Sequence, residues 1–222
     1  DPPIDNQTLA LSNEEAKYLQ DAEHLGGFVL GDLTLPQLGA AIGDGDEERL
    51  ASYLAVDFVG ELFQPDAGKR ALLEVADVRT WRSPRDATRT VDGRGFVSQV
   101  MAWRAEFTRL NSASLKVMLM RPESHGEFDG PWVGSLKLRL TGKRVDGRIA
   151  EREVRFRCRL NSLTEDQPDR RGWLAGCVAY EARLSQAREH LFEEMQDETG
   201  IDVTALHDNW KRADKTNLPF LT

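Results

Sequence analysis

Four acidic side chains near residue 45 form the densest group of possible metal ligands in the chain. Asp44, Asp46, Glu47 and Glu48 offer carboxylate oxygens, which are the ligands that calcium prefers. The segment lacks the twelve-residue loop that closes on a bidentate glutamate, and the helix dipole already favours acidic residues at a helix start. We therefore interpret this group as helix-capping residues and predict no metal site.

The other residue types that support catalysis do not fall at catalytic spacing. The histidines are far apart and include no i, i+4 pair: they are His24, His125, His190 and His207. The sequence contains no Gly-x-Ser-x-Gly elbow, no phosphate-binding glycine-rich loop and no dinucleotide fingerprint. Nucleophilic catalysis and nucleotide binding therefore have no support, and we expect no cofactor.

Composition narrows the classes of partner. A net charge of −8 and a pI near 5.1 argue against nucleic acid, because neutralising phosphates requires a dominant basic surface. No apolar run approaches the length of a membrane span, so we expect none. Hydrophobic residues make up 40% of the chain, which is enough for a core.

The N-terminal half of the chain carries helix signals. Ser12 and Glu15 form a capping box for a first helix, which Gly26-Gly27 is expected to end or interrupt. A helical hairpin follows, with residues 35–42 as one arm and a helix capped by Asp44 or Asp46 as the other.

Between this hairpin and the later strands the pattern changes twice. Residues 58–63 and 72–81 are expected to be strands, and Asp92 is expected to cap a long amphipathic helix over residues 95–110. That helix is predicted to lie across the sheet.

Four long strands are predicted after this helix, at residues 114–121, 132–141, 149–163 and 173–184. Asp146-Gly147 supplies the positive φ angles of a tight hairpin between the second and the third. Alternation of apolar and charged residues marks one buried face on these strands.

Both faces of the last strand look apolar. One face carries Trp173, Ala175, Cys177 and Ala179, and the other carries Leu174, Val178, Tyr180 and Leu184. We expect the second set to be covered, by a helix over residues 186–198, by the N-terminal helix or by a second copy of the chain. Cys158 and Cys177 are equidistant from the loop between their strands, so they are expected to face each other in the core, with or without a bond.

These elements predict an α+β fold in which a curved, mainly antiparallel sheet wraps around helices as a cystatin-like cone, with extra N- and C-terminal helices. We assign residues 1–32 to an N-terminal helical extension, 33–185 to the cone domain, and 186–222 to a C-terminal helix and tail.

The order of elements resembles the nuclear transport factor 2-like superfamily, whose members share such a cone. The segment from Ala40 through Gly43-Asp44-Gly45-Asp46 to Asp57-Phe58 is similar to the family's opening, and the Asp146-Gly147-Arg148 hairpin and Gly172-Trp173 also match. This fold hosts many unrelated functions, so the resemblance implies a shape more than a task.

The resemblance also implies where an isomerase-type acid and base would stand. Those positions fall near Leu38 and Leu62, and neither side chain can move a proton. Tyr53 and Asp57 lie close by and are the candidate substitutes, because a carboxylate buried in a pocket gains basicity. The alternative is that Tyr53 packs under the sheet and Asp57 caps a helix end or turn.

Aromatic residues could form a binding pocket in such a cone. Tyr53, Trp81, Trp103, Phe107 and Trp132 are predicted either to line an apolar pocket for a small ligand or to fill it as core.

A row of basic residues could bind an acidic partner. Arg155, Arg157 and Arg159, with Lys137 and Arg139, are expected on the outer face of the sheet. The alternative is pairing within the sheet to Glu151, Glu153 and Glu181.

A second resemblance lies near the C-terminus. Residues 191–202 are similar to the lead-in of FG-GAP/VCBS-type β-propellers in large exported bacterial proteins. Our leading hypothesis is therefore a noncatalytic ligand-binding or protein-interaction module of a larger, exported or cell-envelope protein. A small-molecule isomerase, cyclase or dehydratase and a homodimerisation unit acting through the sheet are the alternatives.

Overall fold

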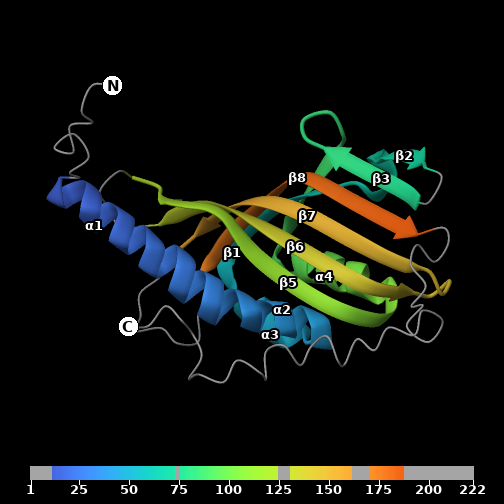
Figure 1. Ribbon diagram of the computed structural model, residues 1–222, viewed down its shortest axis with the longest axis horizontal. Helices are drawn as coiled ribbons and strands as arrows, with labels where there is room; N and C mark the ends of the chain where they lie inside the picture. The colour runs from blue at the N-terminus through green and yellow to red at the C-terminus, as the bar shows by residue number, and fades with distance from the viewer. Residues whose placement is uncertain (1–11, 74–75, 125–130, 162–170, 188–222) are drawn as a thin grey trace, which may run out of the picture. The chain divides into compact units, whose positions relative to one another are not determined.

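The computed structural model describes residues 12–73, 76–124, 131–161 and 171–187. The chain divides into two units, residues 1–189 and 190–222, and all described residues belong to the first. These residues form an α+β structure in which an open sheet of eight strands packs against helices (Figure 1). The fold class predicted from the sequence, a curved and mainly antiparallel sheet over helices, is confirmed.

The helices begin where the sequence places its caps. The Ser12–Glu15 capping box is present, Asp46 Oδ1 accepts from the Arg49 amide at 2.9 Å, and Asp92 Oδ1 accepts from the Gly95 amide at 2.8 Å. The helical elements are α1 (Asn13–Ala22), the π-helical η2 (Glu23–Thr34), α2 (Leu35–Asp44), α3 (Glu47–Ser52), the short 3₁₀ turn η3 (Pro65–Ala67) and α4 (Gly93–Ala105).

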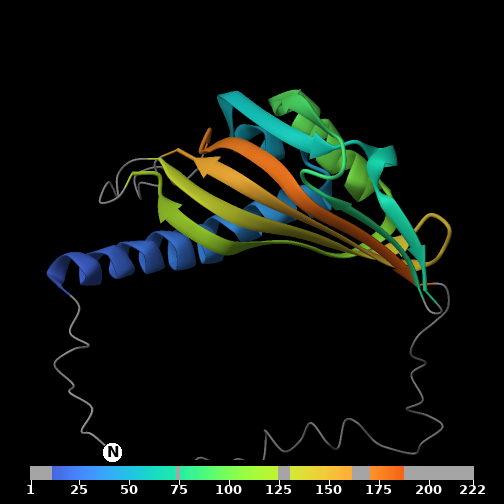
Figure 2. The ribbon, with the colours of Figure 1, turned by 90° about the horizontal axis from the view of Figure 1, so that it is seen from above.

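The strands are joined in the order β2-β3-β8-β7-β6-β5, and β1 pairs in parallel with β8 and antiparallel with β4. Their twist is visible in Figure 2. The bounds are β1 (Leu54–Phe63), β2 (Lys69–Leu72), β3 (Ala76–Arg82), β4 (Thr88–Asp92), β5 (Phe107–Pro122), β6 (Trp132–Arg144), β7 (Ile149–Leu160) and β8 (Leu174–Ala187). The Asp146-Gly147 hairpin joins β6 to β7, with Gly147 at φ 84°.

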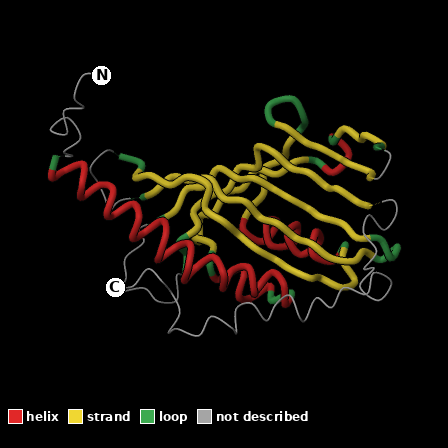
Figure 3. Tube along the Cα trace, viewed as in Figure 1, coloured by secondary structure: helices red, strands yellow, loops and turns green. Residues whose placement is uncertain are grey.

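Gly26-Gly27 do not end the helical backbone, but the α-helix gives way to a π-helix, Glu23–Thr34, that contains them. Helical backbone continues from α1 through η2 into α2 without a break (Figure 3). Glycine costs about 1 kcal/mol in a helix interior, but Val29 and Leu30 in the same stretch are 1% and 0% exposed. Their burial outweighs the local preference of the two glycines.

The long amphipathic helix also ends earlier than predicted. α4 stops at Ala105, and Phe107 and Leu110 belong to β5, where Phe107 pairs with Arg144. The spacing of these apolar residues fits a helix period as well as a strand interrupted by bulges. Register shifts on either side of Arg109 produce the second arrangement.

Bulges likewise change the faces of β8. Register shifts next to Leu160 and Phe156 of β7 place Leu174 and Leu184 on the same side as Cys177 and Ala179, so the two predicted sets of residues are wrong. Leu174 is 2% exposed and Val178 is 38% exposed. Gln186 and Ala187 end β8, and the rest of the predicted helix at 186–198 lies outside the described residues.

The register of β7 and β8 confirms the predicted cysteine pair. Cys158 and Cys177 are directly opposite each other, both thiols are buried and free, and the two Sγ atoms are 3.1 Å apart.

The two faces of the sheet differ in what covers them. On the helix-covered face, Phe96 and Trp103 of α4 pack on Phe156 of β7, with ring centroids 6.0 and 6.5 Å apart. On the opposite side, called the open face below, stand Arg157 and Arg159, both exposed. No helix in the described part of the chain is long and apolar enough to cross a membrane.

Candidate functional site

The two acid–base candidates lie apart from the pockets described below. Tyr53 follows the end of α3, is 4% exposed, and its hydroxyl donates to Gln37 Oε1 at 3.5 Å. Asp57 stands exposed on β1. Leu38 and Leu62, at the positions where the resemblance implies an acid and a base, are buried core residues.

The predicted aromatic set divides between core and pocket. Phe107 and Trp132 are 1% and 0% exposed and, like Tyr53, belong to the hydrophobic core. Trp81 and Trp103 are also buried, but their rings line a pocket of about 230 Å³ on the helix-covered face. This pocket is bounded by α4, by η3 and by the adjoining parts of β1, β3, β6, β7 and β8.

Arg152 of β7 is the most deeply buried charged group of this pocket. The side chain occupies the inward position of the strand alternation and the residue is 7% exposed. The guanidinium carbon lies 5.6 Å from the Trp103 ring centroid and 5.8 Å from that of Trp81, which is within cation–π range of both. Its Nη2 donates to Glu106 Oε1 at 2.6 Å.

Burial opposes the charge of Arg152. The pKa of the guanidinium is lowered because the site removes water from it, while the Glu106 carboxylate acts in the opposite direction. Arg144 and Arg79 lower the pKa of Arg152 further, since like charges disfavour one another. Three guanidinium groups thus act on one another with the single carboxylate of Glu106 among them in the pocket lining.

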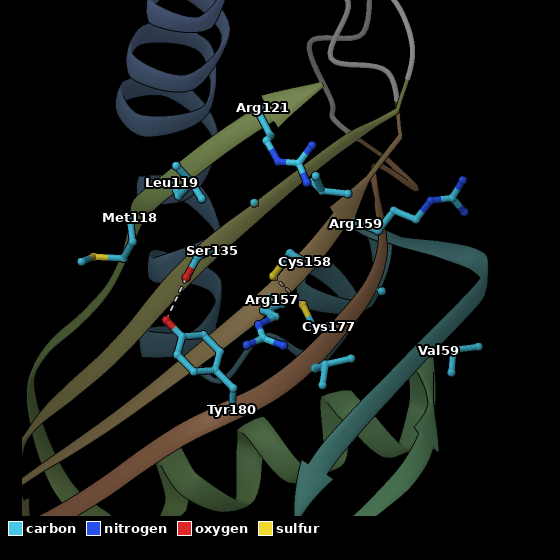
Figure 4. A pocket seen from close by; sticks show the side chains of 14 residues that line it. Val59, Met118, Leu119, Arg121, Ser135, Arg157, Cys158, Arg159, Cys177 and Tyr180 are labelled. Carbon is cyan, nitrogen blue, oxygen red and sulfur yellow. Dashed lines mark hydrogen bonds between the residues drawn. The ribbon is translucent and has the colours of Figure 1, made fainter. Parts of the chain in front are cut away.

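A larger hollow of about 750 Å³ lies on the open face, across β5, β6, β7, β8 and β1 (Figure 4). Most of its lining is apolar or glycine, and four of these side chains are well exposed: Val59 58%, Met118 51%, Leu119 61% and Val178 38%.

The polar lining of the open-face pocket is basic. Arg121, Arg157 and Arg159 line it, and no carboxylate belongs to its described lining. Arg157 stacks over the Tyr180 ring at 5.4 Å from the centroid, and the Tyr180 hydroxyl lies 3.0 Å from Ser135 Oγ (Figure 4).

The rest of the predicted arginine row is paired within the sheet. Arg155 bonds to Glu153 at 2.9 Å and pairs with Glu181 at 3.1 Å, and Arg139 pairs with Glu151. Arg159 is paired with Glu123 at 3.1 Å, just outside the open-face pocket. The row therefore splits into pairs within the sheet and a basic rim on the pocket.

The cysteine pair lies in the sheet beneath the open-face pocket. Burial raises the pKa of the Cys177 thiol well above its ordinary value, and the neighbouring Cys158 acts in the same direction. The Cys177 thiol is therefore held in its neutral form, and both cysteines belong to the hydrophobic core. Among the described residues, no group of three or more His, Cys, Asp or Glu side chains could hold a metal ion.

Sequence reasoning missed Arg152 and Glu106. The signal for Arg152 was present, because extending the alternation of Val154 and Phe156 back by two residues puts it on the buried face. Glu106 was hidden by the wrong end of the preceding helix, which it caps rather than continues.

A scan against models of protein families gives no match for this chain, and a search of curated proteins gives none either.

Proposed function

We propose that this domain is a noncatalytic binding module whose open-face pocket takes a partner segment with apolar and acidic side chains. The observation that carries the proposal is the lining of that pocket, where exposed apolar side chains lie beside three arginines and no described carboxylate.

Physical chemistry favours this occupant. Exposed apolar side chains grouped in one hollow are stabilised when a partner removes them from water. The chain as a whole carries a net charge of −8, so a basic rim is a local exception that would orient an acidic partner. Apolar contacts would supply affinity and the arginines would supply selectivity.

The noncatalytic part of the proposal rests on where the two acid–base candidates lie. Neither Tyr53 nor Asp57 lines the open-face or the helix-covered pocket. General acid–base catalysis requires a group within hydrogen-bond reach of the substrate. Turnover of an enolisable ketone that disappears in Asp57→Asn, with the fold intact by circular dichroism, would contradict this part and favour the enzyme alternative.

A second copy of the chain is the alternative occupant, and the exposure of Leu119 and Val59 is the observation that favours it. A two-fold interface brings the same surface of both copies together, so the arginines of the two rims would face each other. That repulsion is why we prefer an acidic partner.

The test begins with displayed random peptides selected on the intact chain. We expect the selected peptides to combine acidic and apolar residues, and their Kd, measured by fluorescence polarisation, to rise at least about tenfold in Leu119→Asp and in Arg157→Glu. Affinity should also fall as salt is added, because the charges are exposed.

Arg183→Glu is the matched control, since Arg183 is an exposed arginine of β8 outside the pocket lining. Its affinity for the selected peptides should be unchanged. Basic consensus peptides, or equal binding by the control and the pocket variants, would contradict the proposal. Sedimentation that shows a dimer lost in Leu119→Asp would instead assign the surface to a second copy.

We also propose a family for this domain and a larger protein to which it belongs. The order of a helical hairpin, a long helix and long antiparallel strands supports membership of the nuclear transport factor 2-like superfamily. The likeness of residues 191–202 to a propeller lead-in supports a longer exported bacterial protein, although these residues lie outside those described. The complete reading frame would test the second idea, by showing a propeller downstream or a signal peptide upstream.

A further inference from the structure

The helix-covered pocket holds a buried cation whose hydrogen bonds are incomplete. Arg152 Nε is fully buried and has no hydrogen-bond partner among the described residues, although Nη2 is bonded to Glu106. Trp81 Nε1 is also buried without a partner, but it lies against Gly68, outside the pocket lining. Buried donors are rarely left in this state, because each costs about 1–3 kcal/mol. Glu106 Oε2 in the same lining is likewise buried without a hydrogen bond, so the Arg152–Glu106 pair leaves one donor and one acceptor open to a ligand.

The charges around Arg152 select an anion. Arg144 Nη1 lies 3.9 Å from Glu106 Oε2 and 3.4 Å from Gln186 Oε1, and Arg79 Nε donates to the Gly68 carbonyl at 3.3 Å. Glu106 is the single carboxylate among the described lining residues, against the guanidinium groups of Arg79, Arg144 and Arg152. The pocket therefore carries a formal excess of two positive charges, from three cations and one anion.

The remaining walls select an organic molecule over a simple ion. Besides the two indole rings, the lining includes Phe63, Pro65 and Leu184. A volume of about 230 Å³ corresponds to roughly seven or eight water-sized groups, since each takes about 30 Å³ in the liquid. The space suits a small molecule with one flat apolar part.

We propose that this pocket binds a small organic carboxylate, with its anionic group toward Arg152 and Arg144 and its apolar part against the apolar lining of Phe63, Pro65 and Leu184. A planar carboxylate matches the fork of a guanidinium group. Arg152 already donates a hydrogen bond to one carboxylate here, that of Glu106. This site is separate from the open-face pocket, so the proposal does not depend on the proposed partner binding.

Sodium benzoate is the probe, and benzamide is its neutral counterpart of similar shape. The readout is the set of indole N–H signals in ¹H–¹⁵N spectra of the full chain. We expect benzoate to shift the Trp81 and Trp103 signals saturably at about millimolar concentration, with those of the core residues Trp132 and Trp173 little changed. Benzamide should shift them far less.

Two variants ask which groups hold the anion. Arg144→Gln removes a partly exposed cation and should raise the Kd for benzoate about tenfold, because a charge-assisted contact is lost. Glu106→Gln removes the competing carboxylate and should lower the Kd severalfold. Arg139→Gln makes the same change in charge at an exposed pair on the open face and should leave the Kd unaltered.

A structural ion pair with no ligand predicts different results. Absence of benzoate shifts up to about 20 mM, equal shifts with benzamide, or an unchanged Kd in Arg144→Gln would overturn the proposal. Sulfate binding tighter than benzoate would also overturn it, since the organic part would then contribute nothing. Thermal unfolding of each variant is measured as well, to verify that every variant compared is folded.

Discussion

Strand β7 supplies arginines to both faces of the sheet, and the burial and the partners of these arginines differ between the two faces. On the open face, Arg155 is paired with glutamates of its own and the next strand, and the exposed Arg157 lies over the Tyr180 ring. On the helix-covered face, Arg152 is enclosed by two tryptophans and bonded to one carboxylate.

The difference shows how strand alternation sets the energetic cost of a charge. An exposed arginine retains most of its hydration, so its pairing contributes about 0–1 kcal/mol to stability. A buried arginine loses that hydration and needs full compensation from partners. An incompletely bonded arginine on the inner face is therefore more informative about binding than a whole row on the outer face.

Replacing the buried and the exposed arginine of β7 by methionine should separate the two faces most strongly. Arg152→Met leaves Glu106 without its main partner, and we expect the free energy of unfolding to fall by about 3 kcal/mol. This is the lower end of the range for a broken buried pair, since the Glu106 side chain is 24% exposed. Urea denaturation gives the value.

Arg157→Met makes the same chemical change on the open face and serves as the control. Its loss should stay below about 1 kcal/mol, the scale of an exposed cation–π contact. Equal losses in the two variants would mean that the faces do not differ in the way described.

The two cysteines report whether solvent reaches the sheet beneath the open-face pocket. Cys177→Ser puts a hydroxyl in place of a thiol that is 2% exposed, and we expect a loss of about 1–2 kcal/mol from the unsatisfied group. Because burial raises the pKa of the Cys177 thiol, it should remain protonated at pH 8 and react slowly with iodoacetamide until urea unfolds the chain. Rapid alkylation in the native state would show that the open-face pocket reaches the thiols.

Much of this architecture could be predicted from the sequence because local rules decide it. Ser12, Asp46 and Asp92 cap helices, Asp146-Gly147 makes its hairpin, and the loop symmetry places Cys158 opposite Cys177. Each of these features depends on residues close in sequence or on a simple count along two strands.

The errors arose where tertiary contacts override local patterns. Burial of Val29 and Leu30 carries the helix through two glycines, and bulges in β5 and β8 shift the faces by one residue. Bulges follow from long-range pairing, so period-two reasoning cannot place them. The Arg152 pocket combines residues from five strands, α4 and the short turn η3, and that convergence is a property of the fold.

The smallest expected effect concerns the apolar lining of the open face. Leu119→Ser removes a side chain that is 61% exposed, so the free energy of unfolding should change by less than about 0.5 kcal/mol. The measurement is urea denaturation at two protein concentrations tenfold apart. A loss above about 1 kcal/mol that grows with concentration would mean that Leu119 is covered by a second copy in the native state, since association stabilises the folded chain by mass action. A small, concentration-independent change would show that the apolar lining is accessible to a partner. The contribution of this exposed residue to stability would then be much smaller than that of the buried Arg152 on the other face.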